Sequence, residues 1–165
     1  MIEVRKASLD DYPVIQGIAH NTWQHTYLPI LSQGQVDYML DMMYSAEAYR
    51  EQVSEKGHHF LLASESDAFL GFASYELNYS PEITKIHKLY VLPEAQGKGI
   101  GQKLLAVIEN EASKNTNDKI VLNVNRYNKA VNFYQKSGFI KIGEEDINIG
   151  NGYLMEDFIM QKFIK

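Results

Sequence analysis

The stretch that decides the fold is Leu89-Tyr90-Val91-Leu92-Pro93-Glu94-Ala95-Gln96-Gly97-Lys98-Gly99-Ile100-Gly101. An apolar run stops at a proline, and three alternate glycines lead into residues 99–114, where apolar positions recur at helical spacing. The pattern predicts a strand, a glycine loop and a helix. Glycine lets successive backbone N–H groups turn inward, and at a helix N-terminus such groups bind anions. The expected ligand is a phosphate or a pyrophosphate.

Two common nucleotide motifs fit this loop poorly. A P-loop needs Ser or Thr directly after its lysine, whereas Gly99 follows Lys98. A dinucleotide-binding loop needs its third glycine one residue later than Gly101, where Gln102 stands. A nucleotide-binding regulator therefore stays a third hypothesis, behind the two given below.

A second informative block is Asn128-Lys129-Ala130-Val131-Asn132-Phe133-Tyr134-Gln135-Lys136-Ser137-Gly138-Phe139. Asn128 suits the N-cap of a short helix, and Gly138 suits its left-handed C-terminal cap. Residues 119–125, apolar and β-branched, predict a strand between the two blocks.

The remainder of the chain continues this alternation of strands and helices, with no repeat or low-complexity segment. The order predicts a mixed sheet with helices on both faces. We expect strands at 2–7, 60–63, 68–75, 83–92, 119–125, 139–142 and 153–163, and helices from Asp10, from Ser32, over 46–56, over 99–114 and from Asn128.

Together the two blocks resemble the GCN5-related N-acetyltransferase (GNAT) family. Its loop has Gln or Arg, two free residues, Gly, one free residue, and Gly or Ala, and Gln96, Gly99 and Gly101 match it. Residues 128–139 match that family's later Asn, Ala, Phe-Tyr and Gly-Phe positions. The resemblance spans nearly the whole chain and implies a single domain, 1–165. It implies a mixed, mostly antiparallel sheet of about seven strands.

The resemblance also implies a site for acetyl-CoA. The strand before the loop would separate from its parallel neighbour, and the pantetheine arm would pair with the strand like an added strand. The backbone N–H of Leu89 would stabilise the oxyanion of the tetrahedral intermediate. The residues implied for the cofactor are Leu89, Tyr90, Val91, Gln96, Gly97, Lys98, Gly99, Ile100, Gly101, Asn125, Asn128 and Tyr134.

Tyr134 takes a catalytic role by the same resemblance, since the family's tyrosine at this place protonates the CoA thiolate. A helical tyrosine also packs in many cores, which is the alternative. Many members carry a glutamate on the fourth strand as general base, but this chain has Lys85-Ile86-His87-Lys88 there. Glu76 is the first substitute, with Glu82 and His87 behind it, and a water chain is equally compatible.

The acceptor pocket of the family lies between the first two helices. Here Trp23 and Tyr27 fall in that region, where aromatic rings hold cationic amines. His87 is the third expected acceptor contact. The alternative for Trp23 is a plug in the core. Acidic and aromatic residues at 37–45 and the net charge of −5 resemble members that acetylate polyamines or dipeptide-like acceptors.

Composition narrows the function further. The absence of cysteine excludes a disulfide framework and a covalent Cys intermediate, and fits the cytoplasm. The negative charge argues against nucleic acid, and no apolar run is long enough for a bilayer. Without a His-Glu-x-x-His motif we expect no metal site. We therefore predict a cytoplasmic N-acetyltransferase that acts on small amines or polyamines, with a peptide N-terminus as the second acceptor. The family suggests a homodimer, and the alternative is a non-catalytic acyl-CoA sensor.

Overall fold

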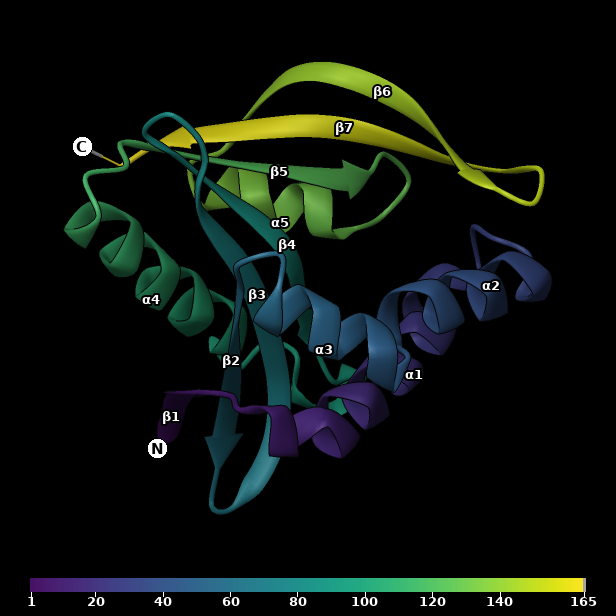
Figure 1. Ribbon diagram of the computed structural model, residues 1–165, viewed down its shortest axis with the longest axis horizontal. Coiled ribbons are helices and arrows are strands. Elements are labelled where there is room, and N and C mark those ends of the chain that lie inside the picture. The colour runs from purple at the N-terminus through teal and green to yellow at the C-terminus, as the bar shows by residue number, and fades with distance from the viewer. Residues whose placement is uncertain (165) are drawn as a thin grey trace.

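The computed structural model describes residues 1–164, which form one seven-stranded sheet in the order β1-β2-β3-β4-β5-β7-β6 (Figure 1). Every neighbouring pair is antiparallel except β4 and β5, which run parallel. The strands are β1 (Ile2–Lys6), β2 (His58–Glu65), β3 (Ala68–Ser80), β4 (Ile83–Val91), β5 (Lys119–Asn125), β6 (Ile140–Gly150) and β7 (Tyr153–Phe163). The helices are α1 (Tyr12–Tyr27), α2 (Gln33–Tyr44), α3 (Ala46–Ser54), α4 (Ile100–Lys114) and α5 (Ala130–Lys136).

Local sequence explains where the helices begin and end. The hydroxyls of Ser32 and Ser45 accept hydrogen bonds from the N–H groups of Gln35 and Ala48, which caps α2 and α3. After α5, Gly138 has φ +100°, a left-handed conformation that glycine adopts without strain.

Two hydrophobic clusters hold the helices against opposite faces of the sheet. The first packs α4 and α5 against one face, with Leu104, Ile108 and Ile120 at its centre. The second packs α1, α2 and α3 against the other face around Trp23 and Phe72. Figure 1 shows α4 and the α1–α3 group on either side of strands β2–β4. The predicted architecture, a mixed sheet covered on both faces, is confirmed.

Strand β4 has one irregularity that matters for function. Ser74 pairs with Lys88 and Tyr75 pairs with Ile86, so His87 is an extra, bulged residue. On its other side, β4 pairs with β5 only from Ile83 to Ile86. Beyond that point the two parallel strands separate, as expected from the resemblance.

Some boundaries differ from the sequence-based expectation. Strand β6 continues to Gly150, although residues 144–150 are mostly polar, because pairing with β7 supplies its hydrogen bonds. Strand β3 likewise extends to Ser80, and α5 begins at Ala130. Asn128 still accepts a hydrogen bond from the Ala130 N–H at 2.9 Å, so it caps the turn before the helix. None of the helices within residues 1–164 combines the length and the apolar character needed to cross a bilayer.

Candidate active site

The glycine loop connects β4 to α4 with its backbone turned inward. Gly97 and Gly99 have φ +85° and +82°, where a side chain would strain the backbone. Helix α4 begins at Ile100, and the Lys103 N–H bonds to the Gly99 carbonyl at 3.1 Å. The backbone N–H groups that precede Lys103 in the first turn of α4 have no carbonyl partner within the helix, so they are available to an anion.

A cavity of about 680 Å³ opens beside this loop. That volume is in the usual range for a small-molecule site. Its walls come from the end of α1, the end of β4, the loop, and the segment between β5 and α5. The lining residues include Thr22, His25, Thr26, Pro29, Ile30, Leu89, Tyr90, Val91, Gln96, Gly97, Gly99, Ile100, Gly101, Tyr127, Asn128, Phe133 and Tyr134.

Most residues expected at the cofactor therefore line one cavity. Two do not. Lys98 extends outward, is half exposed, and lies 3.7 Å from Glu65. Asn125 is buried, where its Oδ1 accepts a hydrogen bond from the Tyr127 N–H at 2.9 Å and shapes the turn after β5.

Gly101, in the first turn of α4, is a position that needs a small residue. A Cβ at this position would lie 3.1 Å from Cζ of Phe133 and 3.7 Å from Cδ2 of Leu89. The glycine thus lets α4 approach α5 at the cavity wall, where the loop packs against Phe133 of the second sequence block.

Tyr134 lines the cavity with only 6% of its surface exposed. Its ring packs edge-on against Phe133 and Phe139. Burial raises the pKa of the Tyr134 phenol above its ordinary value, so the hydroxyl carries its proton at neutral pH. A protonated hydroxyl on the cavity wall can donate to a leaving group.

The sequence model of the acetyltransferase (GNAT) domain matches residues 27–155. This chain belongs to the GNAT acetyltransferase family. Spermidine N(1)-acetyltransferase of Thermoplasma acidophilum is 29% identical over 160 residues, covering 94% of this chain and 96% of that protein. The uncharacterized N-acetyltransferase YuaI of Bacillus subtilis is 27% identical, with 94% of this chain and 90% of that protein covered.

Solved structures agree with this assignment. PaiA N-acetyltransferase of Thermoplasma acidophilum in complex with coenzyme A has a TM-score of 0.82 at 29% identity, covering 99% of both chains. A GCN5-related N-acetyltransferase from Rhodopseudomonas palustris shares the fold, with a TM-score of 0.83 at 20% identity over 98% and 94% of the two chains. This chain is therefore an acetyl-CoA-dependent N-acetyltransferase that acts on amines.

Trp23 and Tyr27, the two aromatic residues expected to contact the acceptor, lie behind the cavity wall and do not line it. Trp23 is 1% exposed and packs against Tyr27, with ring centroids 4.3 Å apart and planes tilted by 40°. The Tyr27 hydroxyl lies 3.4 Å from the Tyr90 hydroxyl and accepts a hydrogen bond from Asn128 Nδ2 at 3.2 Å. Trp23 is therefore a core residue, which is the alternative given for it in the sequence analysis. The wall itself comes from another face of α1, through Thr22, His25 and Thr26, and from Pro29 just after the helix.

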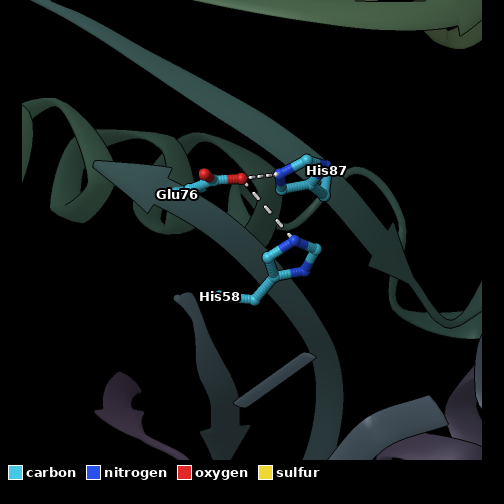
Figure 2. Close-up of side chains that lie close together, drawn as sticks. All are labelled: His58, Glu76 and His87. Atoms are coloured by element: carbon cyan, nitrogen blue, oxygen red, sulfur yellow. Dashed lines mark hydrogen bonds and ion pairs between the residues drawn. The ribbon is translucent and has the colours of Figure 1, made fainter. Parts of the chain in front are cut away.

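Glu76 and His87 lie together, but they are not among the residues that line the cavity. His87 Nε2 and Glu76 Oε1 are 3.0 Å apart, and His58 Nε2 lies 3.7 Å from the same oxygen (Figure 2). The rings of His58 and His87 stack with centroids 3.9 Å apart and planes 12° apart. Burial, followed by nearby positive charges, lowers the pKa of each histidine to about 3, so both rings are neutral at pH 7.

Sequence alone points to Glu76 and His87 but not to His58, the third member of this cluster. No local signal identifies it, since His58, Glu76 and His87 belong to three separate strands. Sequence alone also does not point to Asp157, a buried carboxylate on β7. It is 6% exposed, its Oδ2 accepts from Asn123 Nδ2 at 3.3 Å, and its Oδ1 is buried without a partner among residues 1–164.

Proposed function

We propose that this acetyltransferase transfers the acetyl group to the primary amine of a small molecule, with a polyamine as the favoured acceptor. The relative from Thermoplasma acidophilum, named a spermidine N(1)-acetyltransferase, supports a polyamine, as does the net charge of −5. A peptide N-terminus is the second candidate. The comparisons give no support to a non-catalytic sensor.

The observation that carries the proposal is the separation of β4 from β5 beside the glycine loop. Pairing ends at Ile86 and Leu122, so backbone groups of β4 that face β5 beyond this point have no strand partner there. The pantetheine arm would take those groups by adding as a strand, with its pyrophosphate at residues 96–101. The arm would bring the thioester to Leu89, which lies on the cavity wall.

The reaction would then proceed by direct attack. The amine nitrogen bonds to the thioester carbon, and the negative charge moves to the carbonyl oxygen. The Leu89 N–H would donate to this oxyanion, an interaction typically worth about 2.7–4 kcal/mol. Collapse of the intermediate breaks the C–S bond, and Tyr134 gives its proton to the CoA sulfur. No cysteine is present to form a covalent acyl-enzyme.

Glu76 is the proposed general base, with His87 as its partner and as the proposed acceptor contact. The carboxylate accepts a hydrogen bond from the neutral imidazole at 3.0 Å, which fixes its orientation. Neither side chain lines the cavity, so a water molecule would relay the proton from the attacking amine to Glu76. His87 is two residues from Leu89 along β4.

Tyr134→Phe tests the proton donor. We expect kcat to fall 10²–10⁴-fold while the Kd for CoA stays unchanged, because the ring remains and only the hydroxyl is lost. Release of CoA thiol from acetyl-CoA, with spermidine, amino acids and an N-terminal peptide as acceptors, measures this and identifies the acceptor. Tyr12→Phe, which removes a hydroxyl bonded to the Tyr44 carbonyl, is the matched control. Full turnover by Tyr134→Phe would exclude the tyrosine as donor.

We further propose that residues 1–165 act as a single domain, that the protein is a cytoplasmic enzyme, and that it forms a homodimer. The absence of cysteine supports the compartment. Edge strand β6 supports the dimer, because Ile140 and Ile142 are 58% and 51% exposed on it. Light scattering after size exclusion, with Ile140→Lys as the variant expected to dissociate, tests the assembly.

A further inference from the structure

The cluster of His58, Glu76 and His87 contains a nearly buried ring without a hydrogen-bond partner. The His58 side chain is 10% exposed, and its Nδ1 is buried with no hydrogen bond. Its Nε2 is 3.7 Å from Glu76, beyond hydrogen-bond distance. Buried polar groups are normally hydrogen-bonded, so an unpartnered ring nitrogen here is free to take a ligand, an ion or a water molecule.

The sheet brings the three side chains together by register and by one irregularity. His58 and Glu76 are direct cross-strand partners of β2 and β3, so they share a face. His87 would point to the opposite face from Lys88 in a regular strand. As the bulged residue of β4, His87 instead lies on the same face of the sheet as Lys88, His58 and Glu76. Figure 2 shows the rings of His58 and His87 directed toward the Glu76 carboxylate.

The chemistry of this set favours a metal ion. One donor atom of each residue lies within 4.8 Å of the others. Two imidazoles and one carboxylate form the ligand set of many zinc sites, in which a fourth position stays open. We propose that His58, Glu76 and His87 bind a divalent transition-metal ion, with zinc as the best-suited ion.

Binding requires one defined movement. The lone pair of an imidazole nitrogen lies in the ring plane, so two parallel rings cannot both direct a lone pair at one ion. One ring must therefore turn out of the stack, and His58 can do so because it has no hydrogen bond to lose. At His87 the ion replaces the proton shared with Glu76, and that proton moves to Nδ1, which keeps the ring neutral.

Nearby charges set the strength of the site. Lys56 and Lys88 act on both histidines, and Lys85 acts on His87, so positive charge near the cluster repels a dication. Burial lowers the pKa of Lys88 to about 7, so Lys88 is only partly charged at neutral pH. Lys88 is buried and donates to Gln52 at 2.9 Å, so it cannot swing away. We therefore expect micromolar affinity for zinc. Magnesium, which prefers oxygen ligands, should not bind.

Zinc titration of the metal-stripped protein tests the site without reference to turnover. Calorimetry should show one zinc per chain, and Tm should rise with zinc concentration but not with magnesium. His58→Gln and His87→Gln should each weaken zinc binding at least tenfold. His59→Gln is the matched control, because this neighbouring histidine stacks on Tyr75 on the other face of β2, and it should bind zinc like the wild type.

Cobalt spectra separate this site from adventitious binding. The wild type should give the intense visible bands of a tetrahedral ion, and His58→Gln should not. Equal zinc affinity in His58→Gln and the wild type, or no zinc-dependent heat, would overturn the proposal. Zinc that binds to the wild type should also inhibit transfer, since a ligated Glu76 cannot accept a proton. Binding without inhibition would support the metal site and remove Glu76 as the base.

Discussion

The glycine loop lies beyond the end of strand β4, and the histidine cluster includes His87 within that strand. The two sites differ in how the sequence specifies them. The loop is contiguous, since residues 96–101 follow β4 after the short segment 92–95 and run into the first turn of α4. The cluster gathers residues from β2, β3 and β4, and it depends on a bulge at His87. A site made by one turn of chain is visible in sequence, whereas a site made by strand register exists only after folding.

The same difference applies to the aromatic residues around the cavity. Tyr134 lies in a recognisable block and lines the cavity. Trp23 was expected near the acceptor because of its neighbourhood in sequence, but it packs among Tyr27, Tyr44 and Tyr90. Which face of α1 meets the cavity is decided by packing against the sheet.

Trp23→Ala should therefore have the largest effect on stability. Deleting an almost fully buried indole removes its contacts and leaves a void, which typically costs about 3–5 kcal/mol. Chemical denaturation measures this loss, and Trp23→Phe should restore much of it. A variant that keeps its stability and loses only affinity for the amine would place Trp23 in the acceptor pocket instead.

Sequence predicted the order of all elements because their hydrophobic periods and caps are local. Proline and glycine marked the end of β4 and the start of α4, and Gly138 marked the end of α5. The length of β6 was not predictable, since its polar residues become a strand only through pairing with β7. The same holds for the bulge at His87, which arises from the fit between β3 and β4.

The positions of the loop, Leu89 and Tyr134 on the cavity wall were predictable, because two motifs in the right order fix them. The wall from α1 and the buried carboxylate of Asp157 were not. Asp157 lies opposite Asn125 and Glu145 across β5, β7 and β6, and that juxtaposition depends on two registers at once.

Gly101→Val tests how strongly the contiguous motif controls the cofactor. The added Cβ would meet Phe133 at 3.1 Å, and a branched side chain would push α5 away and fill the cavity. We expect the Kd for CoA to rise about 100-fold, which corresponds to roughly 2.7 kcal/mol. Calorimetry with CoA measures it. Unchanged affinity would mean that the cofactor does not use this part of the loop.

Gly97→Ala isolates the backbone conformation from steric filling. No atom lies within 4 Å of the position of an added Cβ, but φ is +85°. Because alanine is strained in this region, we expect a loss of about 1 kcal/mol in stability. CoA affinity should weaken if the loop relaxes. Gly17→Ala is the matched control, since it also meets nothing within 4 Å and lies within α1, where alanine should be neutral or stabilising.

The smallest expected effect concerns Asp157, a register-dependent group like the histidine cluster. Burial, opposed by a hydrogen bond from Asn123 and then reinforced by the charge of Glu145, raises the pKa of its carboxyl above the ordinary value; Arg126 and Lys85 act in the opposite direction. The folded state therefore holds this proton more tightly than the unfolded state. Stability falls as pH rises from the ordinary Asp value through the folded pKa, because the buried group must ionise.

Asp157→Asn should be slightly more stable than the wild type at pH 8, and the difference should vanish below about pH 4. Thermal unfolding across this range measures it, and Glu145→Gln should give a smaller gain of the same sign. A less stable Asp157→Asn at pH 8 would show that the ionised carboxylate is a favourable part of the fold. A gain in stability with a loss of acetyl transfer would instead mark Asp157 as a second group that sequence reasoning could not find, retained for the reaction at the expense of the fold.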